Sequence, residues 1–225
     1  MKCETNKELF MQRLTERQNA VLIGSVLGDL HIQKTPSRTG TCRLRFCHSV
    51  KQKEFVDWKY QVFEKDFCQQ VKSPFVEKSK TRNDYLFYTS YRDEFKQPHT
   101  DWYSLVESTD PDKGERFVKQ VPLNITQILT DPLALAVWYL DDGTKRSDTE
   151  SCRIATQSFL EKENKLLQEA VATNFTISAK IEDWGRTKEG NTPFSLSILS
   201  KDYKRFRDEI NDIVKTEIPS MLYKL

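Results

Sequence analysis

Two aspartates, Asp29 and Asp142, each stand at the end of a run of apolar residues. If these runs are helices, each carboxylate lies at the negative end of the helix dipole, beside unpaired carbonyl groups. This position disfavours its negative charge by roughly 0.3 to 1 kcal/mol. If the helices lie side by side, repulsion between the carboxylates adds to that cost. A divalent cation would remove it, because carboxylate and carbonyl oxygens are the ligands that Mg²⁺ prefers. The pair therefore predicts a metal centre, although Asp142 with Gly143 alone would equally suit a simple turn.

The elements that must position these carboxylates begin with the two apolar runs. Each run starts with a capping pattern, and together they predict helices over residues 15–29 and 131–142. Both are apolar on nearly all sides, so we expect them to be buried in the middle of the molecule. Gly24 and Gly28 share one helical face, where the missing side chains would let another backbone come close. Two central helices packed on each other fit this pattern.

An internal repeat follows the two helices. Residues 41–46 align with 151–156, and each segment precedes a helix-like stretch. Residues 85–95 resemble 194–203, where a strand runs into a polar helix start. The chain therefore resembles a diverged tandem duplication of strands and helices.

Alternation in the first of these strands separates two faces. Cys42, Leu44 and Phe46 alternate with Arg43 and Arg45, which places the core on one face and bases on the other. Such a basic face could lie along the major groove of DNA, where arginine suits guanine and glutamine suits adenine. A half-exposed sheet of any soluble protein would show the same pattern. The same reasoning adds Lys78, Lys80, Arg82, Lys145, Arg153, Gln157, Lys180, Arg186 and Lys188 to the predicted DNA-facing set.

Composition narrows the class further. The chain has 225 residues, of which 37% are hydrophobic, enough for one large domain or two small packed halves. Its 35 basic and 33 acidic residues nearly cancel, but the acids gather in helix-like segments and the bases in strand-like ones, which indicates a basic sheet face. There is no apolar run of about 18 residues and the start is polar, so we expect an intracellular protein without a membrane partner.

The two helices carry a resemblance to the LAGLIDADG homing endonucleases, in particular the single-chain type with two motif copies. Residues 22–30 and 135–143 lie on the nine-residue motif, and the eighth position of each is the aspartate, Asp29 or Asp142. Two copies at this spacing, each heading a strand and helix repeat, are a specific signal. The chain departs from the motif at Leu30, where the final glycine is missing, and at Asp141, which leaves open which neighbouring acid binds metal.

The resemblance implies an α+β fold of two pseudo-symmetric αββαββα halves, residues 1–122 and 123–225, that form a DNA-binding saddle of antiparallel sheets around two central helices. It implies a monomer that cuts both strands of a long duplex DNA site by metal-dependent hydrolysis, leaving 5′ phosphates and short 3′ overhangs. Mg²⁺ is the implied cofactor, with Mn²⁺ able to substitute and Ca²⁺ able to bind without supporting cleavage. An organelle, or the cytoplasm of a microbe, is the implied location.

Four side chains are implied as catalytic. Besides the two aspartates these are Lys119, three residues before Pro122, and Lys224 in the segment Tyr-Lys-Leu, since single-chain members of the family carry lysines at these places. Each lysine would lie near one scissile phosphate and stabilise developing charge. The implied metal ligands are Asp29, Asp142, Gly28 through its carbonyl, and Asp141.

Two other functions share this fold. An intron RNA maturase would use it to bind its host intron RNA, and a DNA-binding regulator would have lost the nuclease activity. Retention of both aspartates and both lysines argues against the regulator, but not against a bifunctional maturase.

Overall fold

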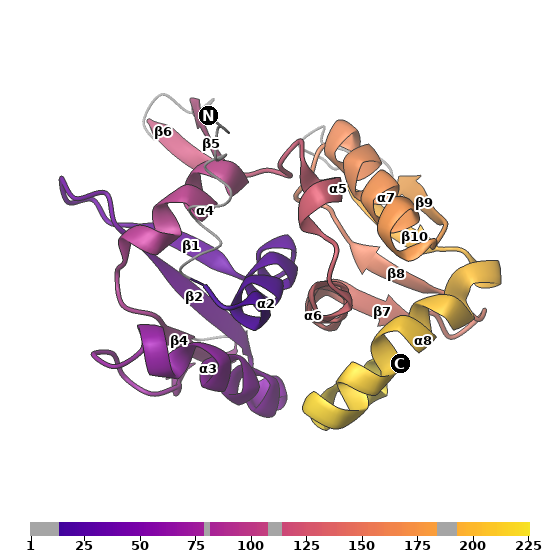
Figure 1. Cartoon of the computed structure of the whole chain (residues 1–225), viewed down its shortest axis with the longest axis horizontal. Coiled ribbons are helices and arrows are strands. Elements are labelled where there is room, and N and C mark those ends of the chain that lie inside the picture. The colour runs from indigo at the N-terminus through magenta and orange to yellow at the C-terminus, as the bar shows by residue number, and fades with distance from the viewer. Residues whose placement is uncertain (1–13, 79–81, 108–113, 184–192) are drawn as a thin grey trace, which may run out of the picture.

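The two helices that carry the aspartates stand at the centre of the molecule, with one half of the chain on each side (Figure 1). The structure is a computed structural model, and it describes residues 14–78, 82–107, 114–183 and 193–225.

Both halves have the same order of elements. In the first half these are α2 (Glu16–Leu27), β1 (His31–Lys34), β2 (Cys42–Ser49), α3 (Lys53–Phe67), β3 (Phe75–Lys78), β4 (Asn83–Tyr88) and α4 (Lys96–Trp102). In the second half they are α6 (Pro132–Asp142), β7 (Gly143–Lys145), β8 (Cys152–Ala155), α7 (Glu161–Phe175), β9 (Ala179–Asp183), β10 (Phe194–Ile198) and α8 (Ser200–Glu217). The predicted α+β fold of two αββαββα repeats is confirmed.

Shorter elements join and extend the halves. A hairpin and a one-turn helix lie between the repeats, and the predicted division after Pro122 falls between these two elements. Three 3₁₀ helices complete the described part. These elements are β5 (Tyr103–Glu107), β6 (Glu115–Lys119), α5 (Ile125–Ile128), η1 (Val50–Gln52), η2 (Asp93–Phe95) and η3 (Pro219–Lys224).

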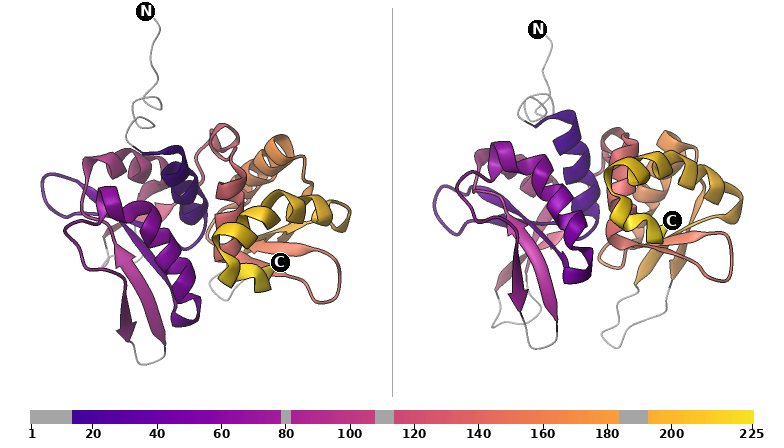
Figure 2. Two further views of the ribbon diagram at one scale, coloured as in Figure 1. Left: turned by 60° about the horizontal axis from the view of Figure 1, so that its bottom comes forward. Right: turned by 90° about the horizontal axis from the view of Figure 1, so that it is seen from below.

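Each half contains one four-stranded antiparallel sheet, in the order β1-β2-β4-β3 or β7-β8-β10-β9. The predicted alternation in β2 is present, since Cys42, Leu44 and Phe46 are buried while Arg43 and Arg45 are partly exposed. Seen from below, the strands of both halves extend to the same side of the molecule, away from the helices (Figure 2). The open faces of the two sheets therefore belong to one broad surface.

The central helices touch almost backbone to backbone. A Cβ atom on Gly24 would lie 2.4 Å from the carbonyl oxygen of Ala134, and one on Gly28 would lie 2.4 Å from Cβ of Asp141. Only glycine fits such approaches, so both glycines face the partner helix as predicted. Almost every residue of α6 is buried, as is most of α2. Among the described residues, no helix combines the length and apolarity needed to cross a membrane.

Candidate metal and nucleic-acid site

The C-terminal ends of α2 and α6 meet, and both predicted aspartates lie there. Gly28 caps α2 and is followed by Asp29, whereas Asp142 is the last residue of α6. The backbone amide of Asp29 donates a hydrogen bond of 3.3 Å to Oδ2 of Asp141 on the other helix. The helix packing thus brings three carboxylates to one place.

One lysine lies at each helix end. Lys119 Nζ donates to the carbonyl of Gly28 at 2.7 Å. Lys224 Nζ donates to the carbonyls of Leu140 and Asp141 at 2.6 and 3.1 Å. A cation is favourable where a helix leaves its last carbonyls unpaired. The structure therefore places one lysine beside each helix end, and both lysines are in the same region as the aspartates.

The charges at the site shift the pKa of these groups unequally. Burial, together with the charges of Asp29 and Asp141, raises the pKa of Asp142 to about 7. Burial also acts to raise the pKa of Asp29, but contact with His48 and nearby positive charges outweigh it, and the pKa is lowered. Burial lowers the pKa of Lys119 and Lys224, although the neighbouring aspartates oppose that shift. Asp142 is thus the carboxylate whose charge is least compensated by the protein.

The donor set of the site fits a hard cation that shares its ligands with a substrate. Within the described ranges, no group of three or more His, Cys, Asp or Glu side chains could hold a metal ion by itself. Mg²⁺ commonly binds through one or two carboxylates, waters and substrate phosphates. The uncompensated Asp142 carboxylate suits such a cation. Asp29, whose side chain is 46% exposed, can reach one from the other helix.

Asp141 is held in a different environment from its neighbour. Its Oδ1 accepts from Lys59 Nζ at 2.6 Å, and both side chains are completely buried. His48 Nε2 lies 3.5 Å from the same oxygen. With one oxygen on Lys59 and the other on the Asp29 amide, the Asp141 carboxylate has its partners inside the protein. The predicted role of Asp141 as a metal ligand has no support in this geometry.

Sequence reasoning missed His48 and Lys59. Lys59 lies four residues after Phe55 and four before Phe63, on the stripe of α3 that faces the core. A lysine in such a stripe must be paired, because an isolated buried ammonium costs several kcal/mol. His48 continues the core-facing alternation of β2. The charged residue in the apolar stripe was the signal that could have been used.

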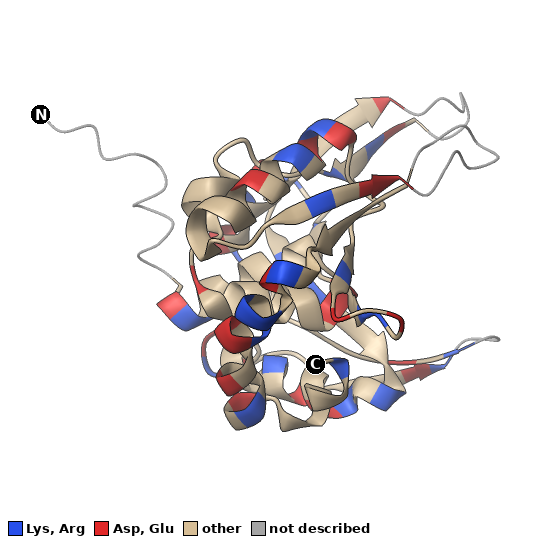
Figure 3. Cartoon of the chain, turned by 90° about the vertical axis from the view of Figure 1, so that its right-hand side faces the viewer, with Lys and Arg blue, Asp and Glu red and all other residues tan. Residues whose placement is uncertain are grey.

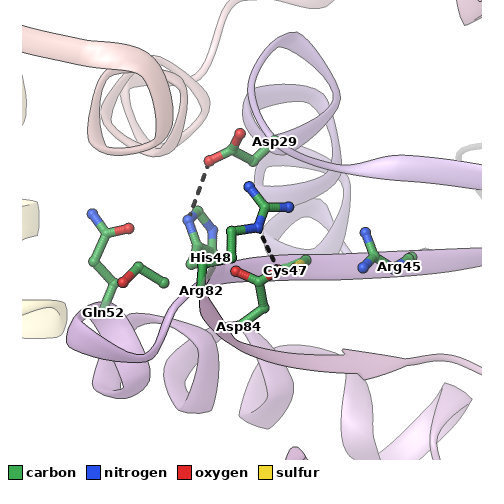
Figure 4. Close-up of a pocket in the computed structure, with 8 residues that line it drawn as sticks. Asp29, Arg45, Cys47, His48, Gln52, Arg82 and Asp84 are labelled. Carbon is green, nitrogen blue, oxygen red and sulfur yellow. Dashed lines mark ion pairs between the residues drawn. The ribbon is translucent and has the colours of Figure 1, made fainter. Parts of the chain in front are cut away.

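A cavity of about 230 Å³ opens beside Asp29 (Figure 4). His48 lies between this cavity and the helix interface, and its Nδ1 is 3.2 Å from Oδ2 of Asp29. The wall also contains Arg82, whose Nε forms an ion pair of 2.9 Å with Asp84. Its polar lining suits water or a phosphate group more than an apolar ligand. The lining residues are Asp29, Arg45, Cys47, His48, Ser49, Gln52, Arg82 and Asp84.

Three of the predicted DNA-facing arginines, Arg43, Arg45 and Arg153, lie on the open face of the sheets. Arg43 lies outside the core. Its Nε donates to Oε1 of Gln33 at 2.9 Å, and its guanidinium lies over the ring of Tyr88. Arg45 lies 3.5 Å from Glu77. In the second half, Arg153 pairs with Glu182 at 2.8 Å.

Strand register places the remaining predicted bases. Lys180 lies opposite Ser197, which lies opposite Arg153 on its other side, so Lys180 and Arg153 share one cross-strand row of the open face. Gln157 is exposed just beyond β8. Lys78 is opposite Asn83, and Lys145 is opposite the buried Cys152. Since residues directly opposite each other point to the same face, these two lysines have the parity of the helix-covered face. Lys80, Arg186 and Lys188 lie outside the described residues.

The sheets are less basic than the sequence indicated. Acidic residues occur on the strands as well as on the helices (Figure 3). Glu77, Asp84 and Glu182 each pair with an arginine of the strands or of the adjoining turn. The surface therefore presents paired charges and not a uniform positive face.

The model of the LAGLIDADG DNA endonuclease family matches residues 19–206. The DNA endonuclease I-ChuI of Chlamydomonas applanata is 25% identical over 219 residues, which cover 94% of this chain and 95% of that protein. The cytochrome b mRNA maturase bI2 of Saccharomyces cerevisiae is 26% identical over 216 residues, 92% of this chain but only 46% of the maturase.

Solved structures share the fold. The homing endonuclease I-WcaI bound to its DNA recognition sequence superposes with a TM-score of 0.73 at 21% identity, covering 100% of this chain and 94% of that one. I-DmoI in complex with DNA and Mn gives a TM-score of 0.53 at 15% identity, covering 86% and 96% of the two chains.

Proposed function

Because the chain belongs to the LAGLIDADG DNA endonuclease family, we propose that it is a site-specific homing endonuclease that cuts both strands of a duplex DNA target with Mg²⁺ as cofactor. The observation that carries this proposal is the meeting of two helix ends, each with an aspartate and each with a lysine on its last carbonyls. Two similar centres in one chain suit the two strands of a duplex.

Each group in this arrangement has a part that its chemistry suits. Asp29 and Asp142 would hold the divalent cation at the helix ends. When bound there, the cation supplies Lewis-acid stabilisation of charge on the phosphate. Lys119 and Lys224, already beside the helix ends, would stabilise the same developing charge from the protein side. Arg43, Arg45 and Arg153 on the open face would fix the position of the duplex, and the paired carboxylates would limit non-specific binding.

The decisive experiment is incubation of the protein with a randomised duplex library and Mg²⁺, followed by sequencing of the cleaved ends. We expect cleavage at one long site, 5′ phosphates, loss of activity with EDTA, recovery with Mn²⁺, and binding without cleavage in Ca²⁺. Asp29→Asn and Asp142→Asn should each bind the recovered site but no longer cut both of its strands. A wild-type protein that cuts no member of the library would remove the proposal.

A second candidate function rests on the relatives called cytochrome b mRNA maturases, in Saccharomyces cerevisiae and Debaryomyces hansenii. By this alternative the chain binds the RNA of its host intron. RNA transcribed from the DNA that surrounds the coding sequence is the probe. Tight binding that unrelated structured RNA does not compete away would support the alternative, and equal competition would contradict it.

A further inference from the structure

The most unusual feature of the molecule is a buried charged cluster that joins the second motif helix to the first half of the chain. It consists of Asp141, Lys59, His48 and Asp29, which come from α6, α3, β2 and the residue after the cap of α2. Lys59 and the Asp141 side chain are fully buried, and the His48 side chain is 1% exposed. Only Asp29 reaches solvent, on the side of the cavity.

The hydrogen-bonding capacity of each group determines which atoms of the cluster donate and which accept. Lys59 Nζ lies 2.6 Å from Asp141 Oδ1 and 3.1 Å from His48 Nε2. An ammonium group has no acceptor, so Nε2 of His48 accepts and Nδ1 carries the proton. Nδ1 faces Oδ2 of Asp29 at 3.2 Å but is not aligned for a hydrogen bond, so this contact is chiefly electrostatic.

The cluster has no counterpart in the other half among the described residues. Helices α3 and α7 both have 15 residues, so Lys59, the seventh of α3, corresponds to Leu167, the seventh of α7. Leu167 is as buried as Lys59. Gly28 occupies in the first motif copy the position that Asp141 has in the second. In the strand repeat, His48 aligns with Ser158, which is exposed. The residues that correspond to these three members of the charged cluster are thus Gly28, Leu167 and Ser158, none of which carries a charge.

We propose that Lys59 and His48 are positioning residues that hold Asp141 at the helix interface and orient Asp29, so that the two cleavage centres are unequally built. Lys59 and the Asp29 amide occupy both oxygens of Asp141, which leaves Asp29 and Asp142 as the carboxylates open to a cation. His48 supports the carboxylate of Asp29, whereas no hydrogen bond or ion pair to the Asp142 side chain was found within the described part of the chain. This inference rests on the proposed nuclease function. It identifies the contact with His48 as the feature that distinguishes the centre at Asp29 from the centre at Asp142.

The first test resolves the two strands. The duplex recovered from the library is labelled differently on each strand, and the strand that Asp29→Asn fails to cut identifies the centre at Asp29. His48→Leu should slow that strand by roughly 10-fold to 100-fold, as is typical for a residue that orients a metal ligand, and the other strand by less than about twofold. His48→Gln, which keeps polar atoms, should recover part of the rate. Equal slowing of both strands would overturn the proposal.

The second test needs no cleavage. In a titration of the DNA-free protein with Mn²⁺ followed by electron paramagnetic resonance, His48→Leu should weaken binding by about tenfold or more. The matched control is His99→Leu, which removes another buried histidine that contacts Tyr103 and Phe117 instead. Unchanged Mn²⁺ affinity in His48→Leu, or the same loss in His99→Leu, would contradict the positioning role. If the wild-type protein cuts no duplex, the proposed function fails but this measurement still decides about the cluster.

The third test addresses Lys59 through stability. Lys59→Met should lower the melting temperature by roughly 10 °C, because it leaves the buried Asp141 carboxylate without its cationic partner. Adding Asp141→Asn should recover much of that loss. Lys53→Met on the exposed side of the same helix, where Lys53 pairs with Asp57, should change the melting temperature little. An unaltered melting temperature in Lys59→Met, or no recovery in the double variant, would refute the pairing on which the proposal depends.

Discussion

The neighbouring acids at the end of α6 have opposite surroundings, although they are simply adjacent in the sequence. Asp141 has buried partners on both oxygens, and Asp142 has a pKa raised to about 7. An ordinary aspartate has a pKa near 3.8. The folded protein therefore keeps a proton on Asp142 between about pH 4 and pH 7 that the unfolded chain releases. Without a cation, this group makes the fold less stable as the pH rises through that window.

Asp142→Asn removes this penalty. We expect the free energy of unfolding of the metal-free protein to rise by about 1 to 2 kcal/mol above pH 7, once solvent screening of this half-buried group is allowed for, and to change little below pH 4. Thermal melts in EDTA across that pH range measure this change in stability. In a separate assay with Mg²⁺, the same variant should lose double-strand cleavage. A variant that is less stable at every pH would indicate a structural aspartate.

Asp141→Asn should behave in the opposite way. It weakens the partner of the buried Lys59 ammonium, so the free energy of unfolding should fall by roughly 3 kcal/mol. The same melts measure it beside Asp142→Asn. Full stability together with abolished metal binding would show that Asp141, and not Asp142, is the ligand.

Each of the two lysines contacts one helix end, so replacing either lysine should slow the cleavage of one DNA strand. Lys119→Met and Lys224→Met keep most of the side-chain volume and remove the charge. We expect each variant to accumulate nicked plasmid, cut in opposite strands, before linear product forms. Equal slowing of both strands by either change would contradict one lysine per centre but would leave the nuclease assignment intact.

At the scale of elements, the features that could be predicted from the sequence are those that hydrophobic periodicity determines. The apolar helices, the alternation of β2 and the repeat of strand and helix all follow from local patterns, and the structure contains them. Strand register does not follow from such patterns. Lys78 and Lys145 were predicted to face DNA, but their cross-strand partners give them the opposite parity. The cluster of Lys59 and Asp141 joins residues far apart in sequence, so only the packing of α3 against the end of α6 reveals it.

The contact between α2 and α6 depends on Gly24. A methyl group there would lie 2.4 Å from the Ala134 carbonyl oxygen, which belongs to the partner backbone and cannot move aside cheaply. Gly24→Ala should therefore lower the free energy of unfolding by roughly 1 to 3 kcal/mol and separate the helix ends enough to slow both strands. Chemical denaturation and plasmid cleavage measure the two effects. The control is Ser25→Ala, since the Ser25 hydroxyl is buried and has no partner among the described residues, so its removal should be neutral.

At the scale of the whole molecule, the open faces of the two sheets form one broad surface with the helix ends between the two halves. Arginines on this surface are paired with Glu77 and Glu182, and a phosphate must compete with those carboxylates for the same guanidinium groups. Such pairing lowers affinity for DNA of any sequence more than affinity for a target whose bases engage the arginines directly. The near balance of charge in the whole chain is consistent with that requirement.

Salt dependence of DNA binding tests this surface as a unit. Bound phosphates release counterions, so affinity for the duplex recovered from the library should fall steeply between 50 mM and about 200 mM salt. Replacing Arg43, Arg45 and Arg153 by methionine should flatten the slope by about one unit for each lost phosphate contact. Glu182→Gln should instead raise affinity for unrelated duplexes, because it frees Arg153 from its 2.8 Å ion pair. Lys165→Met on α7, where Lys165 pairs with Glu161 on the helix side, is the control and should leave the slope unchanged. A steep slope that survives in the triple arginine variant would show that DNA binds elsewhere on the molecule.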